Sequence, residues 1–363
     1  MKLEKFVMTV IIPAYHVGPY LERCLTSLQN QQLVAWCGVV TDDGSRDETG
    51  VIADNFARRE QRLTIVHQPN RGVAIARNRG LERIETPYFT FVDPDDWIEP
   101  EHFQRLYDLV LQRDDCIAVV NVMDHASDGK TVTRWHPVLS SGLHALSAPV
   151  IYKLGTLINK LFPTMLLGSL KFFEGLEFGE DIVFSVMIMS RARGGVVFDS
   201  EFCGYHYMRR PVSLAHGRTQ LDGARRYWDD SLILYRHRST LLSPSSFREW
   251  MFRSMSGHIT SIFSLRDAFQ LAKLFTGEEA RCIWQEMWTV PCAPGDNQYY
   301  AGHRSQAGGY GLIFGWVPSV PLKAVTFWGW NWGWRLLSLG KRGVWRGWRR
   351  LWEGMSSSDS LSK

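Results

Sequence analysis

The sequence predicts an α/β protein in which helices cover both faces of a mostly parallel sheet. Short β-branched and aromatic runs alternate with segments of helical apolar spacing through the first 110 residues, which is the pattern of successive βαβ units. Polar or acidic residues follow three of these runs directly. The chain is 45% apolar and 13% aromatic, and this composition excludes a disordered protein.

The expected strands and helices follow one another in order. Strands are predicted at 7–12, 38–41, 63–67 and 88–92, and helices at 18–32, 47–60, 73–85 and from Ile98. Farther along, the pattern predicts a strand at 117–122, a helix at 182–190, and helical structure from about 221 with a capping box at 246–249. Ligands of parallel sheets bind beyond the carboxyl ends of the strands, so segments 13–16, 42–45 and 93–96 mark the expected site.

Charge and tryptophan content divide the chain into parts. Residues 1–110 carry 12 basic and 16 acidic side chains, whereas 321–355 carry seven basic side chains, one acidic side chain and seven of the 15 tryptophans. We therefore expect a globular domain over 1–220, a helical region over 221–320 and a basic, Trp-rich tail over 321–363. The formal charge of the whole chain is only +4, which excludes a nucleic-acid polycation.

The cysteine pattern and the hydropathy indicate a cellular location. The six cysteines form no CxxC pair, so neither a zinc site nor a disulfide framework is predicted and a reducing compartment is favoured. No apolar stretch approaches the roughly 20 residues of a spanning helix. These features predict a cytoplasmic protein, soluble or peripheral to a membrane.

The acidic cluster Asp93-Pro94-Asp95-Asp96 is the strongest candidate for chemistry. Three neighbouring carboxylates repel one another, and hard oxygen ligands suit Mg²⁺ or Mn²⁺. A solvated turn that caps the following helix explains the same residues equally well.

The other candidates also have structural alternatives. Asp42 and Asp43 fit either a nucleotide contact or an Asx turn. Arg77, near a helix start that Arg71 and Gly72 open, fits either a phosphate contact or a solvated helix face. Asp181 fits either a general base or an acidic first helical turn, and His206 either a metal ligand or a structural histidine.

The order of these segments is more specific than any one of them. VIIPAYH (10–16), DDGS (42–45), NRGVAxARNxG (70–80), FVDPDDW (91–97), NKLF (159–162) and GEDIVF (179–184) occur in sequence. Together they resemble family-2 glycosyltransferases, inverting enzymes with the Rossmann-like GT-A fold that build bacterial surface polysaccharides. The resemblance covers about residues 6–215.

The resemblance implies roles for individual residues. Its catalytic domain would bind the nucleotide sugar through 1–115 and the acceptor through 116–220. Asp181 would be the general base, Arg77 would approach the donor diphosphate, and Asp95 or Asp96, with His206 as a further contact, would bind Mn²⁺ or Mg²⁺. The nucleotide pocket would be formed by Pro13, Ala14, Tyr15, Asp42, Asp43 and Asp93. His16 stands where the family usually has Asn, and Pro94 replaces a small residue.

This reading predicts a metal-dependent transferase that moves a sugar from a nucleotide sugar, most often a UDP-sugar, to a glycan or lipid-linked acceptor. The alternatives are a nucleotidyltransferase that acts on sugar phosphates and a non-catalytic glycan-binding protein with the same fold. A G-x-G-x-x-G after the first strand and a P-loop motif are both absent, which disfavours dinucleotide oxidoreductases and P-loop NTPases.

The tail adds a prediction of its own. On a helix, Val344, Trp345, Trp348, Leu351 and Trp352 of KRGVWRGWRRLW (341–352) share one face. Basic and Trp-rich amphipathic segments bind anionic membrane interfaces, so 321–355 predicts attachment to the inner face of the cell membrane. The alternative is that the aromatic stripe packs on the catalytic domain.

Overall fold

The computed structural model describes residues 6–113, 115–126, 132–135, 139–145, 154, 156–176, 179–209, 229–230 and 233. The chain divides into two compact units, 1–217 and 218–363, and the architecture below is that of the first. The expected helical region at 221–320 lies almost wholly outside the described residues, and the tail at 321–363 lies entirely outside them. No described helix is both long and apolar enough to cross a membrane.

An eight-stranded sheet forms the centre of this unit, with the strand order β3-β2-β1-β4-β10-β6-β11-β9. Its strands are β1 (Met8–Ala14), β2 (Trp36–Asp42), β3 (Leu63–His67), β4 (Tyr88–Phe91), β6 (Ile117–Val120), β9 (Gly142–His144), β10 (Lys160–Pro163) and β11 (Val196–Asp199). β10 and β9 run antiparallel to their neighbours, and the other neighbouring strands pair parallel. The predicted parallel sheet is therefore confirmed for its first half and mixed in its second.

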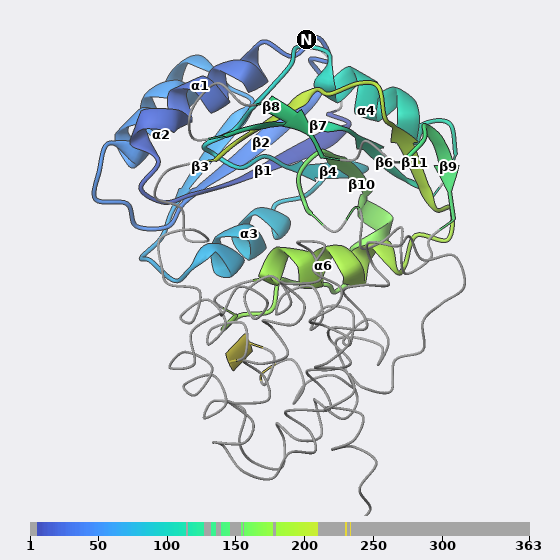
Figure 1. Ribbon diagram of the computed structural model, residues 1–363. Helices are drawn as coiled ribbons and strands as arrows, with labels where there is room; N and C mark the ends of the chain where they lie inside the picture. The colour runs from blue at the N-terminus through green and yellow to red at the C-terminus, as the bar shows by residue number, and fades with distance from the viewer. Residues whose placement is uncertain are drawn as a thin grey trace, which may run out of the picture. The chain divides into compact units, whose positions relative to one another are not determined.

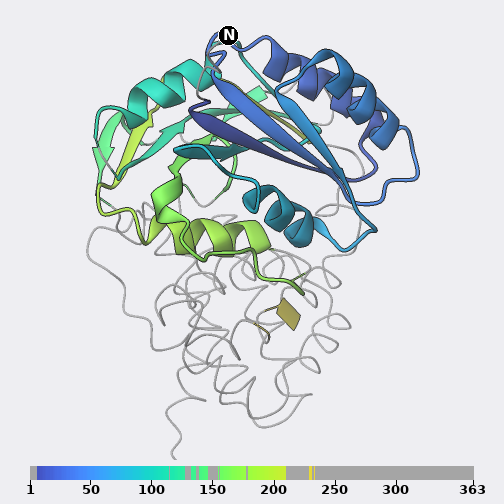
Figure 2. The same cartoon turned by 180° about the vertical axis from the view of Figure 1, so that it is seen from behind.

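Helices cover both faces of the large sheet, as predicted. Figure 1 shows α1 (Gly18–Gln29), α2 (Thr49–Arg59) and α4 (His102–Val110) on one face, with α3 (Val73–Leu81) and α6 (Glu180–Met189) on the other. The reverse view agrees (Figure 2). A short 3-10 turn, η1 (Thr164–Leu166), follows β10.

Alternation along the strands produces one apolar core on each face. Val10 and Ile12 of β1 pack under α1 and α2, whereas Ile11 between them belongs to the opposite core with Phe91 and Phe184. This is the period-2 pattern of a strand buried on both sides. The two cores hold the carboxyl ends of β1, β2 and β4 in fixed positions.

A smaller four-stranded sheet, which the sequence did not predict, has the order β5-β12-β7-β8. Its strands are β5 (Trp97–Ile98), β7 (Val122–His125), β8 (Val132–Arg134) and β12 (Tyr205–Met208). Ile98 therefore lies in a strand, and the helix expected from that residue begins at His102. β5 directly follows the acidic cluster, so the small sheet ties the cluster to β12.

Candidate functional site

The carboxyl ends of the parallel strands meet at one edge of the large sheet. The register places Ala14 at the end of β1 opposite Asp42, and Asp42 opposite His67 at the end of β3. β4 pairs parallel with β1 on its other side and leads directly into the acidic cluster. The sequence prediction that segments 13–16, 42–45 and 93–96 converge is confirmed.

Asp42 is buried, with 5% of its surface exposed, and both of its oxygens accept or share hydrogen bonds. Oδ1 accepts from the Ser45 amide at 3.1 Å, and Oδ2 lies 3.0 Å from Nδ1 of His67. The bond from Ser45, three residues along the chain, is a local side-chain to backbone bond that holds the loop after β2. In this structure Asp42 shapes the loop after β2.

Asp43 holds the loop that leads into α3. Its Oδ1 accepts from the Gln68 side chain at 2.6 Å and from the Arg71 amide at 2.9 Å, and its Oδ2 accepts from the Gly72 amide at 2.8 Å. Gly72 has a φ of 92°, which only glycine adopts without strain. Asp43 and Gly72 together place the amino terminus of α3, with Arg71 exposed beside it, at the site edge.

The three residues predicted to line the pocket after β1 differ in what they present. Pro13 and Ala14 belong to β1 and are buried, and Ala14 packs in the core under α1 and α2. Tyr15 is 46% exposed and packs edge-on against His16, with the ring centroids 4.3 Å apart. Tyr15 is therefore the side chain of this segment that can contact a ligand.

Tyr205 of β12 and Asp96 fix the acidic turn through hydrogen bonds. The Tyr205 hydroxyl accepts from the Asp93 amide at 3.0 Å and donates to Oδ2 of Asp96 at 2.8 Å. Oδ1 of Asp96 accepts from the Met208 amide at 2.8 Å. Asp96 is fully buried, and this burial, with the nearby Asp95 and Asp93 carboxylates, raises its pKa well above the ordinary value.

This geometry argues against Asp96 as a metal ligand. Both of its oxygens accept hydrogen bonds from β12, Oδ2 from the Tyr205 hydroxyl and Oδ1 from the Met208 amide. We assign Asp96 to holding the turn.

His206, the other residue expected near a metal, is also committed to the protein. Its ring stacks on Trp97 at 4.8 Å, its Nδ1 lies 2.8 Å from Nε2 of His125, and its Nε2 lies 2.7 Å from Oε1 of Glu99. The Arg23 guanidinium covers the Trp97 ring at 3.9 Å. His206 therefore supports the segment after the acidic turn, and the structure gives it no ring nitrogen for a metal.

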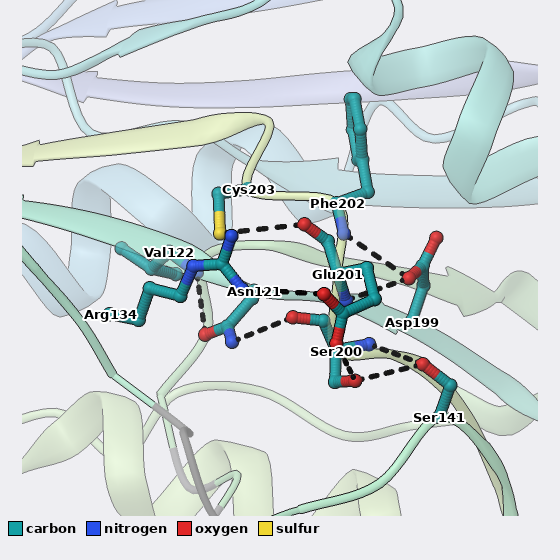
Figure 3. Close-up of polar contacts among 9 residues, drawn as sticks. All are labelled: Asn121, Val122, Arg134, Ser141, Asp199, Ser200, Glu201, Phe202 and Cys203. Carbon is teal, nitrogen blue, oxygen red and sulfur yellow. Dashed lines mark hydrogen bonds and ion pairs between the residues drawn. The ribbon is translucent and has the colours of Figure 1, made fainter.

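The connection from β11 to β12 delivers Tyr205 and His206, and it is tightly fixed (Figure 3). Oδ1 of Asp199 accepts from the amides of Glu201 and Phe202 at 3.0 and 3.2 Å. The Asn121 side chain donates to the Ser200 carbonyl at 3.1 Å. These bonds close a compact turn and so fix where β12 begins relative to the acidic cluster.

Arg77 does not point to a free phosphate position. It is 7% exposed, and its guanidinium donates to Oε1 of Glu180 at 2.6 Å and to Oδ1 of Asp93 at 3.3 Å. Burial would lower the pKa of Arg77, but Glu180, Asp93 and Asp181 outweigh it and raise that pKa. The prediction that Arg77 contacts the donor diphosphate is not supported by this geometry; Arg77 joins the acidic turn to α6.

Asp181 lies in the first turn of α6, next to Glu180. Loss of hydration, reinforced by the Glu180 charge, raises the pKa of Asp181 to about 7, although Arg77 opposes the shift. A carboxylate with a pKa near neutrality is suited to accept a proton in catalysis. The structure thus brings the predicted base and the acidic turn together through the Glu180–Arg77–Asp93 bridge.

The carboxylates that could hold a divalent cation are Asp93 and Asp95. Mg²⁺ and related cations are usually bound by one or two carboxylates together with substrate phosphates, and the donor chemistry of these two residues fits that pattern. Within the described residues, no group of three or more His, Cys, Asp or Glu side chains is arranged to hold a metal.

Three residues of this network had no separate role in the sequence analysis. Glu180 accepts the Arg77 guanidinium, Tyr205 bridges the acidic turn, and Lys160 is fully buried near α6. Glu180 and Lys160 stand inside two motifs of the resemblance, GEDIVF and NKLF, and Tyr205 directly precedes the candidate His206. The sequence motifs therefore indicated the segments that form the site, but which side chains bond to one another depends on contacts between distant segments.

A separate open pocket of about 830 Å³ lies between α4 and the end of β11. Gln104, Arg105, Asp108 and Asp199 are among its lining residues. None of the predicted site residues lines it.

Comparison with known proteins supports the motif resemblance. Residues 9–162 match the family described as "Glycosyl transferase family 2". The chain is similar to the "Uncharacterized glycosyltransferase EpsJ" of Bacillus subtilis, with 29% identity over 220 residues, 57% of this chain and 62% of that protein. It is also similar to the "Putative teichuronic acid biosynthesis glycosyltransferase TuaG" of the same organism, with 27% identity over 132 residues, 36% of this chain and 52% of that protein.

The chain spans less than two thirds of either relative's length. Among solved structures, residues 1–349 of S. aureus TarS in complex with UDP-GlcNAc match with a TM-score of 0.66 and 17% identity, covering 91% of this chain and 92% of that one. At this identity the match establishes a shared fold.

Proposed function

We propose that the chain is a family-2 glycosyltransferase with the GT-A fold, an inverting transferase of polysaccharide biosynthesis; the match of residues 9–162 to the "Glycosyl transferase family 2" model and the fold shared with TarS support this. The donor is a nucleotide sugar, a UDP-sugar in our proposal, and the acceptor is a hydroxyl group of a glycan or lipid-linked glycan. TarS, which shares the fold, was solved with UDP-GlcNAc, and this supports a uridine nucleotide. The observation that carries the proposal is the position of Asp181, a carboxyl with a pKa of about 7 that directly follows Glu180, which Arg77 joins to Asp93 of the acidic turn.

We assign the donor contacts to the exposed groups at the site edge. Tyr15 offers an aromatic face for the base, and the loop that Asp43 orders lies beside it. The amino terminus of α3 carries a partial positive charge, and the exposed Arg71 adds a full one. These two features, in place of Arg77, are the groups that we propose for the diphosphate.

The reaction is a single displacement at the anomeric carbon. Asp181 accepts the proton of the acceptor hydroxyl, whose oxygen forms a new bond to the anomeric carbon from the face opposite the leaving group. The bond from that carbon to the phosphate oxygen breaks, and its electron pair leaves with the nucleoside diphosphate. Asp93 and Asp95 would hold a divalent cation, which when bound neutralises charge on the leaving diphosphate.

A donor screen tests this function. Thermal-shift measurements with a panel of nucleotide sugars, with and without Mn²⁺, should show stabilisation by a UDP-sugar that is larger with the cation, because a ligand that binds the native state stabilises it. Asp95→Ala should abolish the effect of Mn²⁺, whereas Asp108→Ala, which removes an exposed carboxylate on α4, should retain it. Stabilisation by no nucleotide sugar, with no cleavage of any of them, would contradict the proposal.

We also propose that the tail at 321–355 attaches the enzyme to an anionic membrane surface on the cytoplasmic side. The support is the sequence of the tail, with seven basic side chains and seven tryptophans. In a flotation assay, the full chain should bind vesicles that contain phosphatidylglycerol more strongly than neutral vesicles. Replacing Trp345, Trp348 and Trp352 together by Ala should reduce that binding, and equal binding by both proteins would reject the tail as the anchor.

A further inference from the structure

Lys160 is a buried cation that the proposed mechanism does not use. It begins β10 with 0% of its surface exposed. Its Nζ donates to Oδ1 of Asn159 at 2.9 Å, to Oγ1 of Thr156 at 3.2 Å and to the carbonyl of Ile158 at 3.2 Å. All three acceptors are neutral. A buried ammonium is costly without a compensating charge nearby, so its retention calls for an explanation.

The segment that carries Lys160 lies against the helix that carries Asp181. The Ser185 hydroxyl of α6 donates to the carbonyl of Thr156 at 3.3 Å. Asp181 precedes Ser185 by four residues and therefore shares its helix face. The Asp181 charge acts on Lys160 accordingly: burial lowers the pKa of Lys160 to about 7, and the Asp181 carboxylate is the charge that opposes this shift.

The backbone fixes the position of this ammonium. Asn159 adopts a left-handed conformation, with a φ of 62°. Its side chain donates to the carbonyl of Val120, and its own carbonyl accepts from the Val120 amide at 3.1 Å. Val120 is the last residue of β6, so Asn159 is clamped to the central sheet. Lys160 is thereby held between the sheet and α6.

The charges that act on Asp181 from neighbouring residues sum to a net negative charge. They come from Arg77 on α3, from Glu180 on α6 and from Asp93 after β4. Arg77 is already bonded to the other two, so this ion triad has a net charge of −1 when all its members are ionised. An ionised Asp181 brings the total to −2. Lys160 adds a cation on which the Asp181 charge acts. Its Nζ donates to Thr156, whose carbonyl accepts from Ser185 of α6.

We propose that Lys160 is a positioning residue for Asp181, whose buried ammonium keeps the Asp181 carboxylate ionised and able to accept the proton of the acceptor. This inference rests on the proposed role of Asp181 as the base. Lys160 does not touch the reacting atoms. It acts through the electric field at Asp181 and through the fixed geometry of the 156–160 segment.

The first test compares Lys160→Met with Lys171→Met in the full chain. Lys171 is an exposed lysine that pairs with Glu82, and it provides the matched control. Removing an opposite charge near a carboxylate raises the pKa of that carboxylate by about one unit or more. We expect the acidic limb of the pH–rate profile to move to higher pH in Lys160→Met, with turnover at pH 7 reduced about fivefold and recovered near pH 9.

The profile of Lys171→Met should coincide with wild type. Lys160→Arg, which keeps the positive charge, should restore much of the activity at pH 7, and donor affinity should be unchanged in all three variants. A Lys160→Met profile that coincides with wild type, or a loss that is equal at every pH, would overturn the proposal.

A second measurement does not depend on activity. In protein labelled with ¹³C at the lysine Cε, the Lys160 resonance should titrate at a lower pH in Asp181→Asn than in wild type, because the neutral amide removes the charge that favours the ammonium. An unchanged titration midpoint of Lys160 would overturn the proposed interaction between Lys160 and Asp181, even if Lys160→Met fails to fold. If the donor screen is negative while this shift is present, the proposed function fails and the pairing stands.

Discussion

Single side chains at this site carry two kinds of duty, and the structure separates them. Asp43, Asp96 and His206 use their polar atoms to hold loops and strands in place. Tyr15 and Asp181 are the residues that we propose for contact with a ligand, because one is exposed and the other has a pKa near neutrality. The sequence identified all five residues, but residue type alone could not divide them. The division depends on partners that are up to about a hundred positions away in the chain.

The proposed role of Asp181 as the base predicts how the activity of the wild-type protein depends on pH. A base must be ionised to accept a proton, and the pKa of this carboxyl is raised to about 7. The value of kcat/KM should therefore rise with pH through the region around 7 and reach a plateau above it. A steady-state pH profile of kcat/KM for the acceptor, measured at a saturating donor concentration, checks this, and a constant kcat/KM between pH 5 and 8 would contradict it.

Tyr205→Phe should destabilise the protein. The change removes the hydroxyl that accepts from the Asp93 amide and donates to Asp96, which leaves buried polar groups unpaired at a cost of about 1–3 kcal/mol. Urea unfolding measures the difference. Tyr107→Phe, which keeps the ring that packs on Tyr88, is the control and should change stability by less than about 0.5 kcal/mol. Equal effects of the two substitutions would show that the hydrogen bonds of the Tyr205 hydroxyl to Asp93 and Asp96 do not contribute to stability.

At the scale of elements, periodicity located the βαβ half of the fold well. The strand predicted at 63–67 is observed with the same bounds, and the helix predicted at 73–85 is observed as α3 at Val73–Leu81. The small sheet was missed because β5 has two residues and its one partner, β12, lies in a distant segment. A two-residue strand has no periodicity to detect, so tertiary pairing alone defines it.

The close packing of α3 on β1 gives a test at this scale. A Cβ at Gly80 would lie 2.5 Å from Cγ2 of Ile11, which is too close for any real contact. Gly80→Ala should therefore force α3 away from β1 and destabilise the protein by about 1–3 kcal/mol, although alanine favours helices. Arg79→Ala, an exposed change in the same helix, should be nearly neutral. Thermal unfolding of both variants would decide, and a more stable Gly80→Ala would contradict the packing.

For the whole molecule, the sequence predicted the fold class and the converging strand ends, because hydrophobic alternation and turn residues are local signals. It could not predict that the second half of the sheet includes antiparallel strands, since pairing direction is set by how distant segments meet. For the same reason the sequence did not predict the Glu180–Arg77–Asp93 bridge, because Glu180 is 103 positions away from Arg77.

The burial of Lys160 should affect how the free energy of unfolding depends on pH. The pKa of Lys160 is lowered from 10.5 to about 7 in the folded state, so between these values the unfolded chain binds more protons. This group therefore contributes a rise in the free energy of unfolding as pH increases from 7 to 10. Lys160→Met lacks that contribution, so its stability relative to wild type should fall over this range. Urea midpoints at several pH values test the prediction, and a constant difference would refute it.

The most direct test of the account is the effect of Asp181→Asn on transfer and on donor binding, measured side by side with the donor found in the screen. The amide keeps the shape of the side chain but cannot accept the acceptor's proton. Turnover should fall about 10²–10⁴-fold, while donor affinity in the presence of Mn²⁺ stays that of the wild type. Turnover close to wild type would show that Asp181 is not the base and that the proposed mechanism is wrong.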